Sequence, residues 1–397
     1  MFEHVPGYAG DPIFHLNEMF HKDPRQQKVN LTIGLYYDDD GQIPVLNTVQ
    51  RAEQQLAAST RPRAYLPIEG DHAYRQRVQA MVFGENHPVV KQGRVATIQS
   101  VGGTGALKVG GEFLHDAYPD SQLWMSDPAW ENHHDIFRGC GIPTHSYPYY
   151  DPTTRALDFN RMVASIRSLP PKSIVLLHAC CHNPTGVDPT PEQWQTLITV
   201  MKEGDLIPFF DMAYQGFGSG MDEDAFAVRA AADAGLSFLV ANSFSKNLSL
   251  YSERCGGLSV VCATAEEADR VLGQLMAVVR RTYSTPPSHG GVVTARVLSD
   301  PDLYRDWQGE VAEMRNRILQ MRARVHSLLA QRVPDYDASH FVNQVGMFSY
   351  TGFSTQVIQR LRNDHGVYVL DSGRISVPGL NSRNVEYFCD AVAASLR

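Results

Sequence analysis

The feature that most constrains the fold is a series of short apolar segments in the middle of the chain, each followed by a helical pattern. These segments are 95–99, 123–126, 173–178, 207–211 and 236–241. They lack the alternation of apolar and polar residues that marks a half-exposed strand, so each is expected to be a strand buried on both faces. Such strands separated by helices predict an α/β fold with a mostly parallel sheet flanked by helices.

The chain changes character on either side of this series. Residues 29–37 alternate apolar and small side chains, which predicts a strand. Beyond residue 262 the spacing is helical over 266–283, 290–299 and a long stretch from about 301 to 329. A helix of that length can link two domains. Short strand and helix patterns then alternate to the C-terminus, which is typical of an α+β unit.

Composition and charge argue against several classes of protein. With 43% hydrophobic and 20% charged residues among 397, the chain has the composition of an ordinary globular protein. A net charge of −8 and a pI of about 6.0, without a basic run, argue against nucleic-acid binding. No stretch approaches a membrane span, and the first residues lack the regions of a signal peptide. We therefore expect a cytoplasmic protein.

The cysteines and histidines do not predict a metal site. His178 and His182 can share a face, and His133 lies beside His134, but no set has the ligand spacing of zinc. No cysteine pair has C-x-x-C spacing, so buried free thiols are expected. The six cysteines are Cys140, Cys180, Cys181, Cys255, Cys262 and Cys389.

One lysine is distinguished by its surroundings. Lys246 follows the expected strand 236–241, at the kind of strand end where open α/β sheets bind ligands. A lysine becomes a nucleophile toward carbonyl groups when burial or a neighbouring cation lowers its pKa. Ser243, Ser245 and Arg254 add donors that suit a phosphate. An ordinary surface lysine is the plain alternative, so this interpretation depends on partners elsewhere in the chain.

Glycines follow the first strand of the series. Gly102, Gly103, Thr104 and Gly105 stand between a strand and a helix, where free backbone N–H groups and the helix dipole favour a phosphate. The spacing fails as a dinucleotide fingerprint, because Lys108 occupies the third glycine position and no P-loop lysine follows. One phosphate is therefore expected rather than a pyrophosphate.

Three other strand ends carry side chains that suit a planar ligand. The face of Trp130 can stack on a ring, although a core tryptophan is an equal alternative. Asn183 can reach a ligand or cap its own turn. Asp211 ends an apolar strand and needs a partner, either at a helix end or on a protonated ring nitrogen. Tyr214 can meet the same ligand. With an aldehyde for Lys246, these features together predict pyridoxal 5′-phosphate.

At this point the chain resembles the class I (fold type I) aminotransferases along essentially its whole length. Within them it is similar to the bacterial aromatic amino acid (tyrosine) aminotransferases, beside aspartate aminotransferase. The resemblance implies a large cofactor-binding domain, 46–312, a smaller α+β domain, 13–45 and 313–397, and an N-terminal arm, 1–12. The motifs that carry it are 8–13, 102–108, 180–186, 213–217, 243–246 and 372–374.

The resemblance implies a role for each matching residue around the cofactor. Lys246 would hold it as a Schiff base and, once freed by substrate, would move a proton. Asp211, with His133 behind it, would keep the ring nitrogen protonated. Tyr214 and Asn183 would bind the ring oxygen. The other implied contacts are Trp130 against the ring and, at the phosphate, Gly103, Thr104, Ser243, Ser245, Arg254 and the partner subunit's Tyr65.

Substrate residues follow from the same resemblance. Arg374 would bind the α-carboxylate through a bidentate contact that lysine would not reproduce. Gly34 lies in the segment implied to close over the substrate, and Trp130 and Asn183 would also contact it. Arg280 would reach from the partner subunit to the distal group of a dicarboxylate. Because such contacts cross between subunits, a homodimer with shared active sites is expected.

Apolar side chains favour an aromatic substrate. Residues 35–37, Ile43 and residues 64–66 are apolar where aspartate-specific relatives more often have polar residues, so the entrance is expected to tolerate a ring. A retained arginine for the distal carboxylate predicts that aspartate, glutamate and 2-oxoglutarate also bind. Thr104 and Thr285 stand where serine is expected in the closest aromatic relatives. The order of preference among tyrosine, phenylalanine, tryptophan and aspartate therefore stays open.

The sequence thus predicts a ping-pong aminotransferase. An aromatic amino acid leaves as its 2-oxo acid, and 2-oxoglutarate takes the amino group to become glutamate. A decarboxylase or β-lyase on the same fold is the nearest alternative. A ligand-sensing domain is disfavoured by the complete catalytic set and by the lack of a DNA-binding segment before residue 1. A nicotinamide dehydrogenase is disfavoured by the missing fingerprint.

Overall fold

The computed structural model describes residues 1–7 and 10–397, which divide into two compact units. The smaller unit comprises Met1–Ile43 and Arg317–Arg397, and the larger unit comprises Pro44–Asn316. The border falls within the long helix α12 (Pro301–Arg332). Tyr8 and Ala9, which belong to the expected arm and to the first motif, lie outside the described residues. The expected domain borders after residues 12, 45 and 312 stay predictions.

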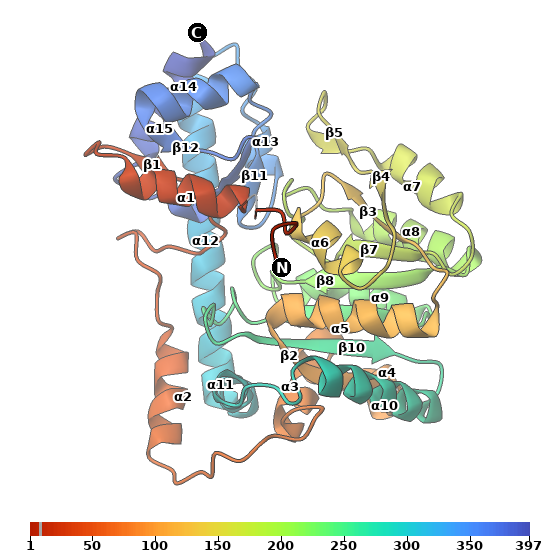
Figure 1. Ribbon diagram of the computed structural model, residues 1–397. Helices are drawn as coiled ribbons and strands as arrows, with labels where there is room; N and C mark the ends of the chain where they lie inside the picture. Colours follow the sequence, from red (N-terminus) through yellow and green to blue (C-terminus); the bar gives the residue numbers. More distant parts are fainter. Residues whose placement is uncertain (8–9) are drawn as a thin grey trace. The chain divides into compact units, whose positions relative to one another are not determined.

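The larger unit is built on a seven-stranded sheet (Figure 1). Neighbouring strands are parallel except around β10, which runs antiparallel to both of its neighbours. The predicted mostly parallel sheet is therefore confirmed. In spatial order the strands are β2 (Val95–Val101), β10 (Cys255–Val261), β9 (Phe238–Ser243), β8 (Ile207–Met212), β7 (Ile174–His178), β3 (Leu123–Asp127) and β4 (Thr144–Pro148).

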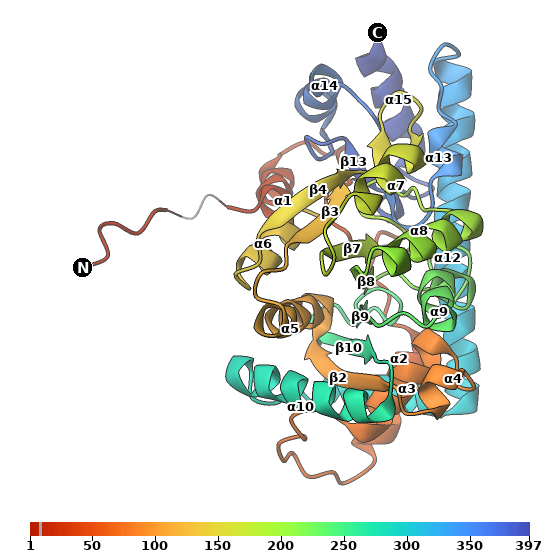
Figure 2. The same cartoon turned by 90° about the vertical axis from the view of Figure 1, so that its right-hand side faces the viewer.

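Helices cover both faces of this sheet, as Figure 2 shows. All residues of β7, β9 and β10 are buried, because side chains on either face of these strands meet a helix rather than water. This double cover explains the unbroken apolar runs. The helices on one face are α5 (Gly102–Ala117), α6 (Asn132–Arg138) and α10 (Ala265–Thr282), and those on the other include α3 (His72–Phe83), α7 (Phe159–Arg167), α8 (Pro191–Glu203) and α9 (Phe226–Asp233).

Local signals set the ends of these helices. α8 begins with a capping box, in which the Thr190 side chain accepts from the N–H of Gln193 and the Gln193 side chain accepts from the N–H of Thr190. Thr264 caps α10 by accepting from the N–H of Glu267. The unit also contains α2 (Asn47–Ala57), α4 (Pro88–Lys91), α11 (His289–Ser299), β5 (Tyr150–Asp151), β6 (Ala156–Leu157) and the 3₁₀ turn Glu223–Ala225.

The smaller unit is α+β, as predicted. Two short sheets form in it, one from the parallel pair β1–β12 and one from the antiparallel pair β11–β13. Its elements are α1 (Pro12–Lys22), β1 (Val29–Asn30), α13 (His340–Asn343), β11 (Phe348–Tyr350), α14 (Thr355–His365), β12 (Val367–Tyr368), β13 (Arg374–Ser376), a 3₁₀ turn (Val377–Gly379) and α15 (Val385–Leu396). In neither unit does a described helix have the length and hydropathy needed to cross a membrane.

The expected strand 29–37 is wrong beyond its first two residues. β1 ends at Asn30 because its partner β12 ends at Tyr368, whose carbonyl accepts the last ladder bond from the N–H of Leu31 at 2.9 Å. The Asn30 side chain then accepts from the N–H and hydroxyl of Thr32, at 3.1 and 2.7 Å. This local bond replaces strand pairing and turns the chain. Residues 34–37 are therefore irregular.

Candidate active site

The candidate residues of the larger unit lie at one edge of its sheet. β3, β7, β8 and β9 form a parallel series, and β2 is parallel to β9 because both run antiparallel to β10. Their carboxyl ends, and the start of β10, therefore share one edge. The structure places Gly103 and Thr104 after β2, Trp130 after β3, Asn183 after β7, Asp211 in β8 with Tyr214 just beyond it, Ser243, Ser245 and Lys246 at the end of β9, and Arg254 before β10.

Asp211 is a buried carboxylate with a histidine partner. Its side chain accepts a 2.8 Å hydrogen bond from Nε2 of His133, and the two residues are only 5% and 1% exposed. Burial alone would raise the pKa of Asp211, but the bond from His133 and the charges of His133 and Lys246 outweigh it and lower the pKa below its ordinary value. Asp211 is thus an ionised acceptor inside the protein, suited to a cationic N–H.

Lys246 lies in a turn that is fixed on both sides. Its Nζ is 5.1 Å from the centroid of the Tyr214 ring. The next residue, Asn247, donates to the carbonyl of Gln215 at 3.2 Å, and its own carbonyl accepts from Trp307 at 2.7 Å. These bonds tie the lysine turn to the segment that carries Tyr214. The amine of Lys246 therefore has a defined position beside Tyr214.

Donors for an anion gather around the start of α5. The helix has no side-chain cap, so no capping side chain occupies the N–H groups of its first turn. The N–H of Gly102 donates to the carbonyl of Arg254 at 3.0 Å. Gly102 has φ +68°, and a Cβ there would lie 2.7 Å from Nη2 of Arg254; a Cβ at Gly103 would lie 3.2 Å from that of Ser243. The hydroxyls of Ser243 and Ser245 are 3.1 Å apart. Only glycines allow the guanidinium and these hydroxyls to approach the helix start so closely.

Trp130 and Asn183 complete the set in the larger unit. Trp130 is half-buried, and its ring meets that of His133 edge to face at 5.1 Å. Asn183 is buried in the turn that follows β7. The structure thus links Trp130 to the Asp211–His133 pair and holds Asn183 at the same sheet edge.

Arg374 and Gly34 come together in the smaller unit. Arg374 is buried in β13, donates to the carbonyl of Thr32 at 2.6 Å and has its Cζ 4.4 Å from the centroid of the Phe348 ring. The same ring packs against Gly34, where a Cβ would lie 2.8 Å from Cζ of Phe348. A larger residue at 34 would displace Phe348 and disturb Arg374.

Tyr65 and Arg280 lie on the surface of the larger unit. Tyr65 is 93% exposed in the segment between α2 and α3. Arg280 is exposed near the C-terminus of α10 and donates to the hydroxyl of Ser284. Both side chains are accessible to another molecule, as contacts across a subunit border require. Their roles stay predictions.

Comparison with known proteins identifies the family. The family model for aminotransferases of class I and II matches residues 26–392. The chain belongs to this family. The aromatic-amino-acid aminotransferase of Escherichia coli (strain K12) is 54% identical over 395 residues, which are 99% of this chain and 100% of the relative. The aspartate aminotransferase of Pseudomonas aeruginosa is 45% identical over 396 residues, with full coverage of both.

A solved structure also matches over its full length. An aromatic-amino-acid aminotransferase from Burkholderia pseudomallei, covalently bound to pyridoxal phosphate, has a TM-score of 0.98 and 45% identity, and the match covers 100% of both chains. The predicted resemblance to class I aminotransferases is thereby confirmed.

In this aminotransferase Asn183 is supported by a residue that was not among the predicted site residues. The carboxylate of Asp188 accepts from the N–H groups of Cys181 and His182, at 2.6 and 2.8 Å, and so closes the turn that carries Asn183. His182 also bonds to the hydroxyl of Ser126 at 2.8 Å, which links this turn to the end of β3. Burial raises the pKa of Asp188 to about 6, although the two backbone bonds counteract it. In the sequence, the only indication of this support is an aspartate five residues after Asn183, close enough to accept from the backbone of the same turn.

His178 was considered only as a metal ligand. Its ring lies 5.2 Å from that of His133, and potential ligand atoms of His133, His178 and Asp211 lie within 4.8 Å of one another. Burial lowers the pKa of His178 to about 4, so its ring is neutral near neutral pH. In this aminotransferase the histidines therefore pack behind Asp211, where His133 serves as its hydrogen-bond donor.

Proposed function

We propose that this aminotransferase transfers the amino group of an aromatic amino acid, tyrosine or phenylalanine, and also of aspartate, to 2-oxoglutarate, with pyridoxal 5′-phosphate as cofactor. The observation that carries the proposal is the meeting of Lys246, the Asp211–His133 pair and the glycine-lined donors of α5 at one sheet edge. The two aromatic-amino-acid aminotransferases matched over the full chain support it.

The residues present fit the cofactor in three separate ways. Lys246 offers an amine to an aldehyde, and the buried, ionised Asp211 offers a counter-charge to a protonated ring nitrogen. The uncapped start of α5, with Arg254 and the serine pair, suits one phosphate. When bound, pyridoxal phosphate supplies an aldehyde that condenses with amines and a protonated ring that withdraws electrons from the α-carbon of the substrate.

The residues of the chain bind and orient the cofactor, and one of them moves a proton. Lys246, once freed by the substrate amine, would act as general base at the α-carbon and would deliver the proton to the carbon of the cofactor's aldehyde group. Asp211 holds the proton on the ring nitrogen. Tyr214 and Asn183 donate to the ring oxygen, and Trp130 packs against the ring face. The bonds of Asn247 to Gln215 and Trp307 hold the turn that carries Lys246 beside Tyr214.

The substrate is bound at its two ends by different means. Arg374 binds the α-carboxylate, and Arg280 of the partner subunit binds a distal carboxylate. An aromatic ring relies instead on the apolar residues 35–37 and Ile43. This division explains how one site takes both classes of substrate. Because Arg280 comes from the partner subunit, the proposal also requires a homodimer with shared active sites. The cytoplasmic location stays a prediction.

The visible absorption spectrum of the purified holoenzyme tests the proposal. Addition of tyrosine alone is expected to remove the absorption band of the lysine-bound cofactor, and subsequent 2-oxoglutarate is expected to restore it. This sequence of changes establishes both half reactions. A band that ignores both compounds would overturn the proposed substrates, and release of carbon dioxide or loss of a side chain would support the decarboxylase or β-lyase alternative.

Two lysine variants make the test specific. Lys246→Ala should lose the lysine-bound band and all measurable turnover while it keeps the wild-type circular dichroism. Lys202→Ala is the matched control, because Lys202 is an exposed lysine that donates to the carbonyl of Ala234 on the surface. Substantial turnover in Lys246→Ala would contradict its role as the proton carrier.

A further inference from the structure

An arginine of α12 contacts the segment that carries the apolar residues 35–37. Cζ of Arg317 lies 5.6 Å from the centroid of the Tyr36 ring, and Tyr36 is buried while Leu35 and Tyr37 are half-buried. A guanidinium at this distance from an aromatic face is attracted to it. Nε and Nη1 of Arg317 are buried and have no hydrogen-bond partner among the described residues. For these two nitrogens of the guanidinium, the contact with the ring of Tyr36 therefore takes the place of a hydrogen bond.

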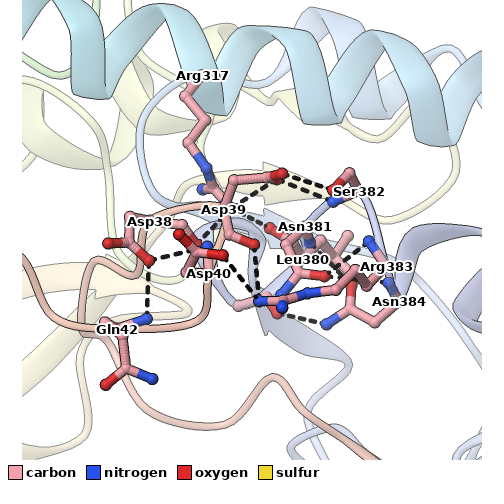
Figure 3. Close-up of polar contacts among 11 residues, drawn as sticks. Asp38, Asp39, Asp40, Gln42, Arg317, Leu380, Asn381, Ser382, Arg383 and Asn384 are labelled. Atoms are coloured by element: carbon pink, nitrogen blue, oxygen red, sulfur yellow. Dashed lines mark hydrogen bonds and ion pairs between the residues drawn. The ribbon is translucent and has the colours of Figure 1, made fainter.

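The chain forms a closed turn directly after Tyr37 (Figure 3). The N–H of Asp38 donates to the carbonyl of Gln42 at 2.8 Å, and the N–H of Gly41 donates to the carbonyl of Asp38 at 3.1 Å. The Asp38 carboxylate accepts from the N–H groups of Asp40 and Gln42, at 3.0 and 2.8 Å. Gly41 supplies the positive φ, +74°, that closes the turn. The turn 38–42 is thus a defined unit that extends the segment 35–37.

Arg317 also ties this turn to the C-terminal part of the chain. Its Nη2 donates to the carbonyls of Asp38 and Leu380, at 3.1 and 2.6 Å, as Figure 3 shows. Asp39 accepts from the N–H and hydroxyl of Ser382, and these bonds lower the pKa of its carboxyl. Arg383 donates to the carbonyl of Asp39 at 3.2 Å. The side chain of Arg317 is only 13% exposed, whereas that of Arg383 is 62% exposed.

We propose that Arg317 is a positioning residue that determines how well the protein accepts aromatic substrates. It holds Tyr36 by its charge and the Asp38 carbonyl by a hydrogen bond, and so sets the orientation of Leu35 and Tyr37. The inference rests on the proposed function, because it assumes that residues 35–37 line the substrate entrance. Apolar binding of a ring depends on closely packed surfaces, whereas a distal carboxylate is held by Arg280. Loosening this segment therefore weakens aromatic binding selectively.

Steady-state kinetics of Arg317→Met test the selectivity. The change keeps an unbranched apolar side chain, although a shorter one, and removes the charge and both hydrogen bonds. We expect KM for phenylalanine to rise about tenfold with kcat within about threefold of wild type, because binding rather than chemistry is lost. KM for aspartate should change by less than about threefold. Arg317→Lys keeps the charge over Tyr36 and should recover part of the loss. Equal losses for both substrates would overturn the proposal.

Arg324→Met is the matched control. Arg324 lies two turns further along the same helix, is half-exposed, and pairs with Glu386 instead of the segment 35–42. Its replacement should leave both KM values unchanged. If Arg317→Met lowers the melting temperature but leaves the ratio of the two KM values unchanged, its role is merely structural and the proposal fails. If the methionine variant does not fold, Arg317→Lys and Ser382→Ala carry the same comparison.

Amide hydrogen exchange of the apoprotein gives a readout that needs no turnover. Residues 35–42 should exchange faster in Arg317→Met than in wild type and in Arg324→Met, because the bonds within the turn 38–42 open more often once the anchor is gone. Unchanged exchange would overturn the positioning role. If the wild-type enzyme transaminates neither phenylalanine nor aspartate, the proposed function fails instead, while the exchange comparison still decides whether Arg317 holds this segment.

Discussion

At the scale of single residues, Asp211 shows how a charge is kept inside the protein. A buried carboxylate is costly unless it is paired and hydrogen-bonded. His133 provides one donor at 2.8 Å, and the charge of Lys246 contributes further, so the pKa of Asp211 stays low despite its burial. The ring of His178, whose pKa is lowered to about 4 by burial, lies 5.2 Å from the ring of His133 behind the pair. The residue is therefore ready to pair with a cationic ligand atom.

Replacing this carboxylate should affect chemistry more than folding. Asp211→Ala is expected to lower kcat for tyrosine by at least about a hundredfold, because a single preorganised electrostatic contact is commonly worth that much. His133→Leu keeps the carboxylate and removes its histidine donor, so a smaller loss is expected. Stopped-flow measurement of each half reaction checks both variants. Near-normal rates in Asp211→Ala would remove the argument for its role at the ring nitrogen.

Two adjacent arginines provide a matched pair for the distal carboxylate. Arg280→Ala should lower kcat/KM for aspartate by about a hundredfold and that for tyrosine by less than about tenfold, because only the dicarboxylate loses a charge-assisted bond. Arg281 instead pairs with Glu112 and Asp116 on the surface, at 3.2 and 2.6 Å. Such exposed pairs contribute little, so Arg281→Ala should resemble wild type. Equal losses for both substrates in Arg280→Ala would show that another residue binds the distal group.

At the scale of elements, the end of β7 and the turn after it contain two buried groups, His178 and Asp188, whose contributions to stability depend on pH in opposite directions. The folded-state pKa of Asp188, about 6, lies above its ordinary value of 3.8, so its contribution to stability is present at low pH and is lost as the pH rises through about 6. The folded-state pKa of His178, about 4, lies below its ordinary value of 6.5, so its contribution is present near neutral pH and is lost as the pH falls through about 4. The two effects oppose each other between these values.

A variant of Asp188 separates its contribution to stability from that of His178. In Asp188→Asn only the histidine effect remains, so the free energy of unfolding of wild type relative to the variant should fall by about 2 kcal/mol between about pH 4 and pH 7. Urea unfolding of both apoproteins across this range measures the difference. Because His178 is present in both, its titration cancels. A constant difference would mean that Asp188 titrates near its ordinary pKa when folded.

At the scale of the whole molecule, Tyr65 and Arg280 are exposed, as residues that act in the active site of a partner subunit would be. Whether the active sites are shared in this way can be tested by activity. If each active site takes Arg280 from the partner subunit, a mixed dimer of Lys246→Ala and Arg280→Ala chains contains one site with both residues intact. Coexpression of the two inactive chains should then restore about a quarter of the wild-type aspartate activity, because half of randomly paired dimers are mixed. Sedimentation velocity checks that dimers form. Absence of any recovery in mixed dimers would refute shared active sites.

The strands and helices that could be predicted from the sequence are those whose burial and ends are reflected in the local pattern of residues. Buried parallel strands read as unbroken apolar runs, and the helices α8 and α10 begin at threonines that cap them. The candidate residues could be assigned to strand ends for the same reason, since each follows an apolar run directly in the chain. Lys246, Asp211 and the glycines after β2 were all found in this way. Their assigned roles came from the family motifs.

Features that depend on contacts between residues far apart in the chain could not be predicted from the sequence. The segment 29–37 has strand-like alternation, yet its pairing stops where β12 stops, which no local pattern records. The antiparallel insertion of β10 and the support of Asn183 by Asp188 are likewise invisible in the alternation of strands and helices. Arg317 bonds to residues 279 and 63 positions away. Such contacts depend on the free energy of the whole fold. Each residue that takes part in one must also be well packed and hydrogen-bonded where it lies.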